Sequence, residues 1–117
     1  MRDRPVLLYD ADCRFCRFVA RVLLRLDRRR RLAFATLQDE AAPALLPGLS
    51  AGERLASIHV VEPDGELRSA GDALVRLVRQ LGLPAPRLLA RVYAPISRRR
   101  RVLGKFVPDG SAPVRFP

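Results

Sequence analysis

The chain is poor in the residues that build metal sites and base-stacking surfaces. Its 117 residues include two cysteines, one histidine, two tyrosines and no tryptophan. A closed zinc site needs four ligands, so these cysteines and His59 cannot complete one without carboxylates or a second chain. Scarce aromatic side chains and the lack of a known RNA or DNA motif argue against a nucleic-acid partner. We therefore expect no bound metal and no organic cofactor.

Long apolar runs are also missing. No stretch reaches the roughly 18 apolar residues that a membrane span requires. The apolar run Val6–Tyr9 is too short for a signal peptide, and Asp3 and Asp10 flank it. We expect a cytoplasmic protein, and in that compartment two close cysteines are more often catalytic or metal-binding than a structural bridge.

Lysine is nearly absent from a strongly basic chain. Lys105 is the only lysine among 22 basic residues, and the formal net charge is +10. Arginine in place of lysine is typical of a GC-rich bacterial genome, so a solvated surface is the simplest interpretation. This interpretation covers the arginines spaced along residues 14–28 and the run Arg98–Arg101. The alternative is a non-catalytic basic module that binds acidic protein, lipid or nucleic acid.

The first third of the chain has the pattern of a βαβ unit. Val6–Tyr9 reads as a short buried strand. From Cys13 to about residue 26, apolar residues recur every three or four positions, which predicts an amphipathic helix with Asp12 as its N-cap. Arg31–Thr36 reads as a second strand. A strand, a helix and a strand within about 30 residues predict a parallel pair with a crossover helix.

The remainder predicts a hairpin, a helix and a tail. A short helix and loop precede the strand Ser57–Val61, the turn Glu62–Glu66 and the strand Leu67–Ser69, and a helix follows over Asp72–Leu81. We thus expect one α/β domain over residues 1–117 with a four-stranded mixed sheet in a core of about 5–82. A helical extension over about 86–107, interrupted or kinked at Pro95, and a loose end over 108–117 complete the prediction.

The stretch "YDADCRFC" places both cysteines where the first helix begins. Free amide groups and the positive end of the helix dipole favour a thiolate in a first helical turn. Arg14 and Arg17 act in the same direction, whereas Asp10 and Asp12 oppose it. We therefore predict that Cys13 is the nucleophile and that Cys16, packed behind it, resolves a mixed disulfide.

The same stretch resembles the D-x-x-C-x-x-C signature of the DCC family of predicted thiol-disulfide oxidoreductases, through Asp10, Cys13 and Cys16. The turn "PDG", the segment "SAGDALVRLVRQLG" and the tail "VYAPISRRRRVLG" are similar to later parts of that family. The resemblance implies a thioredoxin-like fold and exchange with protein or small thiol and disulfide substrates. Ala11 stands where many relatives have glycine. Ser57 lies near the position where thioredoxins carry a cis-proline facing the cysteines.

Several residues have two interpretations. The cysteines can be inert buried thiols, or ligands of a metal shared across a dimer. Asp10 either ends the first strand or, as a buried carboxylate, passes protons to Cys16. We expect Tyr9 to pack in the core or to line the site, and Phe15 to be an exposed substrate contact rather than a core residue. His59 is expected to be a hydrogen-bonded structural histidine. The substrate, the electron donor and the oligomeric state stay open.

Overall fold

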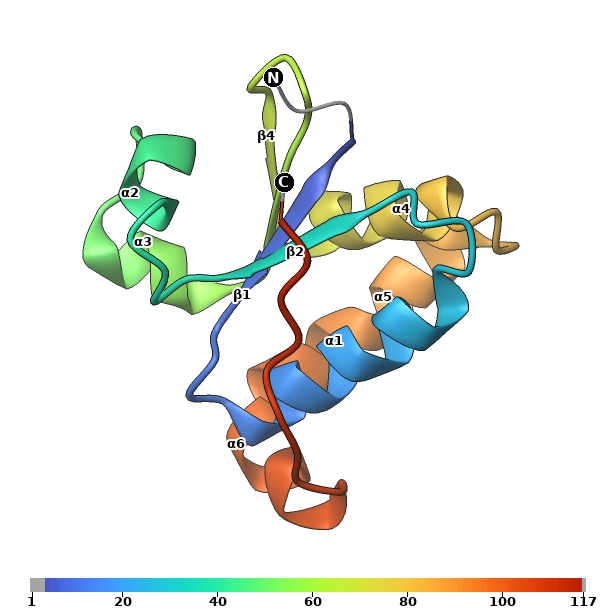
Figure 1. The fold of residues 1–117 in the computed structure, drawn as a ribbon. Coiled ribbons are helices and arrows are strands. Elements are labelled where there is room, and N and C mark those ends of the chain that lie inside the picture. Colours follow the sequence, from blue (N-terminus) through green and yellow to red (C-terminus); the bar gives the residue numbers. More distant parts are fainter. Residues whose placement is uncertain (1–3, 117) are drawn as a thin grey trace.

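The computed structural model describes residues 4–116, in which a four-stranded sheet forms the centre (Figure 1). Its strands are β1 (Val6–Tyr9), β2 (Ala33–Thr36), β3 (His59–Val61) and β4 (Leu67–Ser69), in the order β2-β1-β3-β4. β1 and β2 are parallel, and the other two pairs are antiparallel. The predicted mixed sheet and the parallel βαβ pair are confirmed, and the fold is thioredoxin-like. Residues 1–3 and Pro117 of the expected domain lie outside the described residues.

Helices cover both faces of this sheet. α1 (Arg14–Leu26) and α4 (Ala70–Gln80) lie on one face, and the short helices α2 (Ala42–Leu45) and α3 (Ala51–Ala56) lie on the other (Figure 1). Side chains alternate along a strand, so successive residues of β1 enter different layers. Leu7 and Tyr9 join the larger cluster beneath α1 and α4, whereas Val6 and Leu8 join the cluster that contains α2.

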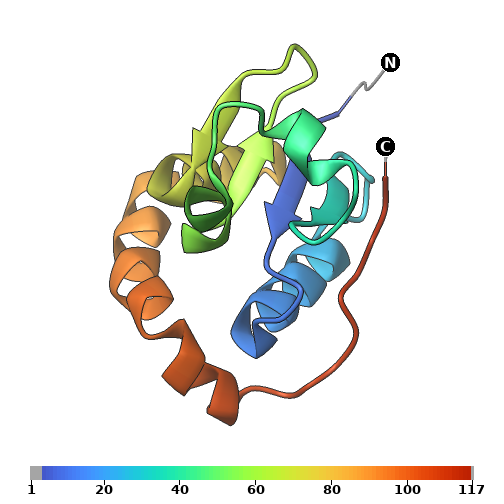
Figure 2. The ribbon, with the colours of Figure 1, turned by 90° about the vertical axis from the view of Figure 1, so that its left-hand side faces the viewer.

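The C-terminal extension curves around α1. α5 (Pro86–Arg98) packs along α4, continues through Pro95 and is followed by α6 (Arg100–Leu103) and the 3₁₀ turn η1 (Gly104–Phe106). Both α6 and η1 contact α1. Figure 2 shows this arc passing from α4 to the N-terminal end of α1. The extension therefore brings its basic end to the turn that carries the cysteines.

Residues 107–116, here called the C-terminal strap, are held against the domain although the sequence predicts a loose end. The strap returns past α1 to the free edge of β2 (Figures 1 and 2), where Phe34 and Arg115 exchange two backbone hydrogen bonds of 2.7 and 2.8 Å. Arg17 donates to Asp109 Oδ1 at 2.7 Å, and Arg21 donates to the Pro108 carbonyl at 2.7 Å. These arginines, expected on a solvated helix face, instead bind the strap through the Asp109 carboxylate and the Pro108 carbonyl, which lie outside helices and strands.

Candidate active site

Cys13 itself caps α1. Its backbone is extended (φ −93°, ψ 114°), and its Sγ accepts the Cys16 N–H at 3.3 Å. The prediction that Asp12 is the N-cap is wrong, because Cys13 occupies the capping position and the exposed Asp12 carboxylate faces Gln38, with Oδ2 3.4 Å from Gln38 Nε2. A sulfur in the capping position meets the free amides of the first turn. A thiolate there accepts such a hydrogen bond better than a thiol does.

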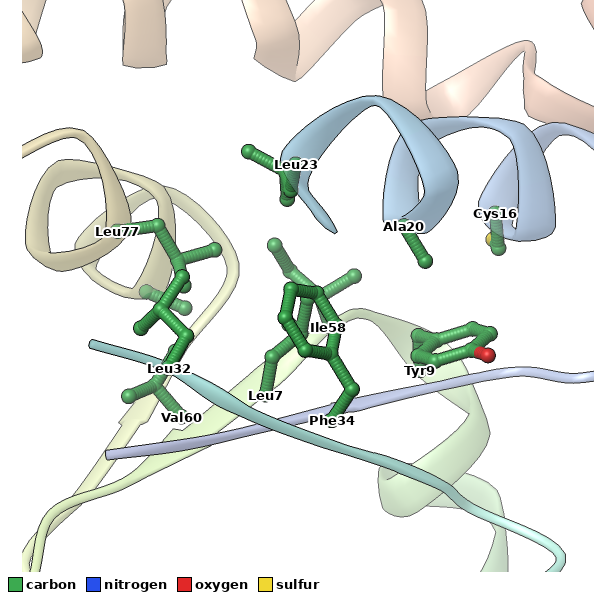
Figure 3. Close-up of a cluster of buried hydrophobic side chains, with 11 residues drawn as sticks. Leu7, Tyr9, Cys16, Ala20, Leu23, Leu32, Phe34, Ile58, Val60 and Leu77 are labelled. Atoms are coloured by element: carbon green, nitrogen blue, oxygen red, sulfur yellow. The ribbon is translucent and has the colours of Figure 1, made fainter. Parts of the chain in front are cut away.

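Cys16 lies one turn further on, in the core. Its side chain lies over the ring of Tyr9 at one end of the larger cluster (Figure 3). Burial raises the pKa of the Cys16 thiol far above its usual range, and hydrogen bonding to Cys13 and the charges of Cys13 and Asp10 raise it further, while Arg100 acts in the opposite direction. Cys16 therefore keeps its proton, whereas Cys13 is half-buried and accessible. The two sulfurs, which are not joined in a disulfide here, are chemically unequal.

The loop before α1 is held by a residue that the sequence analysis missed. Gln38 Nε2 donates to Asp10 Oδ1 at 2.8 Å and more weakly to Asp12 Oδ2 at 3.4 Å, and Gln38 Oε1 accepts the Ala11 N–H at 2.9 Å. Gln38 lies two residues after the end of β2. Since β1 and β2 are parallel, residues after their carboxyl ends lie together, and this was the signal available in the sequence. Gln38 thus fixes the two carboxylates beside Cys13.

Tyr9 and Phe15 are both buried. Tyr9 is in the core, where its hydroxyl donates to the Pro113 carbonyl of the strap at 2.6 Å, and burial raises its pKa. The expectation that Phe15 is exposed is wrong, because only 9% of it is accessible. The reason is η1, which lies over the first turn of α1. A Cβ placed on Gly104 would be 3.4 Å from the Phe15 nitrogen and 3.8 Å from its Cβ.

Cys13 opens into a pocket of about 440 Å³ between the cysteine loop and the C-terminal extension. The lining comes from these two segments only: Asp10, Asp12, Cys13, Arg14, Arg100, Arg101, Gly104 and Lys105. Of the predicted site residues, Asp10 is half-buried and Arg14 exposed. Ser57 does not line this pocket. It ends α3, and its hydroxyl donates to the Ile58 carbonyl.

His59 has the structural environment that was expected for it. It is buried in β3, with Nε2 2.9 Å from the Arg54 carbonyl and Nδ1 2.6 Å from Ser69 Oγ. A carbonyl only accepts, so Nε2 carries the proton and Nδ1 accepts from the hydroxyl. Burial lowers the His59 pKa. Over residues 4–116, no three His, Cys, Asp or Glu side chains gather as a metal site would require.

Comparison with known proteins agrees with this geometry. The sequence profile of the DCC1-like thiol-disulfide oxidoreductase family matches residues 7–105. The chain belongs to that family. The match takes in the cysteine loop, the sheet except for Val6, and the extension as far as Lys105, and so contains both walls of the pocket.

The chain is also similar to a plant protein of the DCC family. A chloroplastic DCC family protein of Arabidopsis thaliana is 31% identical over 88 residues, which is 73% of this chain and 49% of the relative. The chain therefore spans about half the length of that protein. No solved structure matches the chain significantly. None of the helices in the described part of this family member has the length and apolar character of a membrane span.

Proposed function

We propose that the protein is a cytoplasmic thiol-disulfide oxidoreductase. Its Cys13–Cys16 pair alternates between dithiol and disulfide by exchange with protein or small thiol substrates. The unequal environments of the two sulfurs carry the proposal. Cys13 faces the pocket and accepts a helix amide, while Cys16 is buried with its pKa raised. Family membership supports the same chemistry.

In the first step, the Cys13 thiolate attacks one sulfur of a substrate disulfide. A bond forms between Cys13 Sγ and that sulfur, the substrate S–S bond breaks, and the other substrate sulfur leaves as a thiolate. Cys16 then loses its proton and attacks Cys13 Sγ, which releases the second substrate thiolate. The cysteine pair has lost two electrons and the substrate has gained them. A thiol donor resets the pair by the reverse steps.

The raised pKa makes proton removal from Cys16 the demanding part of the second step. Once Cys13 is bound in a mixed disulfide, its negative charge is gone, and one cause of the raised pKa disappears with it. Arg100 then stabilises the developing thiolate. Asp10, whose charge is felt at Cys16, is our candidate for the group that accepts the proton.

Trapping of the mixed disulfide tests the order of attack. We would treat the wild type, Cys13→Ser and Cys16→Ser proteins with hydroxyethyl disulfide and measure their masses. Cys16→Ser should accumulate one adduct on Cys13, the wild type should give the internal disulfide, and Cys13→Ser should stay unmodified over the same time. An adduct that forms on Cys16 of the Cys13→Ser protein at the wild-type rate contradicts the proposal.

A second candidate function rests on the basic surface. A groove of about 590 Å³ between α4 and α5 is lined by five arginines, namely Arg68, Arg76, Arg79, Arg87 and Arg91. Arg68 and Arg76 are already paired with Glu62, which leaves three without an ion pair in the part of the chain that the structure describes. Binding of nucleic acid that weakens steeply with salt and is unchanged by Cys13→Ser would favour this binding module.

A further inference from the structure

The pocket beside Cys13 has an unusual charge distribution. Four positive side chains and two negative ones line it, namely Arg14, Arg100, Arg101 and Lys105 against Asp10 and Asp12. Within residues 4–116 none of the six takes part in an ion pair. Their charges therefore remain available to a ligand.

Three of these groups, Arg100, Asp10 and Asp12, form side-chain hydrogen bonds to neutral partners. Arg100 donates to the carbonyls of Leu55 and Ala56 at 2.9 and 3.0 Å, which are neutral acceptors. Asp10 and Asp12 accept from the neutral amide of Gln38. Neutral partners fix the positions of these side chains without cancelling their charge.

The negative and most of the positive side chains lie on different walls of the pocket. The carboxylates belong to the loop before α1, and three of the four cations belong to α6 and η1. The close approach of η1 to α1 at Gly104, where a Cβ would lie 3.4 Å from the Phe15 nitrogen, holds these walls together. A ligand whose sulfur reaches Cys13 therefore meets cations on one side and carboxylates on the other.

We infer that the pocket selects a small peptide-like thiol or disulfide that carries carboxylates and an ammonium group, with the carboxylates on Arg101 and Lys105 and the ammonium group near Asp10 or Asp12. Arginine and lysine are the usual partners of carboxylates in binding sites. The volume of about 440 Å³ lies in the range of small-molecule pockets. The inference rests on the proposed function, since it names the substrate of the same site.

Glutathione disulfide has the required groups and serves as the probe. Cys13 attacks one of its sulfurs, a protein–glutathione disulfide forms, and one glutathione thiolate leaves. Cys16 gives up its proton, for which Asp10 is the candidate acceptor, and attacks Cys13 Sγ, which releases the second glutathione. Two electrons pass from the cysteine pair to the probe, and two glutathione molecules restore the pair in reverse.

The experiment isolates the first step in the Cys16→Ser protein. We would measure rates of mixed-disulfide formation with glutathione disulfide, neutral hydroxyethyl disulfide and cationic cystamine, each divided by its rate with free 2-mercaptoethanol. The corrected rate for glutathione disulfide should exceed that for hydroxyethyl disulfide about tenfold at low salt. It should fall about fivefold when Arg101 and Lys105 are both replaced by alanine, because each exposed charge has a modest effect.

Arg25→Ala is the matched control, since Arg25 is an exposed arginine in the last turn of α1, away from the pocket lining. It should leave all three rates unchanged. Added salt should lower the glutathione preference of the protein that retains both Arg101 and Lys105, which tests the charge effect without those substitutions. Equal corrected rates, a preference for cystamine, or an equal effect of Arg25→Ala would overturn the inference alone. Failure to react with all three disulfides would overturn the proposed function.

Discussion

Replacing Asp27 with asparagine should destabilise the protein strongly, because this carboxylate joins the end of α1, the start of β2 and the strap. Its side chain is 1% exposed. It accepts the Arg31 N–H at 2.8 Å and the Leu32 N–H at 2.9 Å, and it forms an ion pair with Arg115. These three partners are all donors, so the amide of asparagine places a fourth donor among them.

The expected cost follows from these contacts. A buried donor left without an acceptor costs about 1–3 kcal/mol. Loss of one partner of a buried pair costs about 3–5 kcal/mol, and the lower end applies because Arg115 is 21% exposed. The lower ends of these two costs give a total of about 4 kcal/mol for Asp27→Asn, which lowers the melting temperature by about 12–20 °C in a chain of this size. Arg115→Met should cost somewhat less, about 3 kcal/mol, because it leaves the Asp27 carboxylate buried without its cation but with both backbone donors.

Urea denaturation followed by circular dichroism measures these differences. Glu40→Gln is the control, because Glu40 is exposed and its substitution removes the same charge. It should change the free energy of unfolding by less than about 0.5 kcal/mol. The double variant Asp27→Asn with Arg115→Met should be less destabilised than the sum of the two. An effect of Asp27→Asn equal to that of Glu40→Gln would refute the reasoning.

Three further predictions concern the site and the sheet. Iodoacetamide should label Cys13 at least tenfold faster than Cys16 in the native protein, as read by peptide mass spectrometry, and equal rates would contradict the asymmetry. Gly104→Ala should retain exchange activity while Gly104→Leu should lose stability and activity, because only a Cβ fits beside the Phe15 backbone; an active, stable Gly104→Leu protein would count against that packing. Because burial lowers the His59 pKa, the free energy of unfolding should fall as pH drops below about 6.5, where the unfolded chain binds the proton. His59→Gln should flatten this dependence between pH 7 and 5, and urea titrations that keep the same slope would disprove it.

The sheet and its main helices could be predicted because their signals are local. Val6–Tyr9 is a short apolar run, the residues of α1 repeat with helical spacing, and a proline, an aspartate and a glycine mark the hairpin turn. These patterns gave the parallel pair and the antiparallel hairpin with nearly correct bounds. The predicted start of this helix, shortly after the strand Val6–Tyr9, also placed both cysteines at the beginning of the helix.

The errors at the site come from contacts between distant parts of the chain or from competition among neighbours. Phe15 is covered by η1, about 90 residues later, and no local pattern reports that contact. Arg17 binds Asp109 of the strap, although its place among the regularly spaced arginines of residues 14–28 predicted a solvated side chain. Asp12 belongs to a residue type that often caps helices, but its N–H donates to Asp10, and Cys13 occupies the capping position instead.

The redox equilibrium of Cys13 and Cys16 tests the central claim most directly. The protein would be equilibrated in graded glutathione buffers, its free thiols trapped by alkylation and its mass measured. Our account predicts a reversible internal disulfide with a potential between about −270 and −120 mV, the range of known exchangers. Failure to form that disulfide, or formation only of disulfide-linked dimers or metal-blocked thiols, would contradict it.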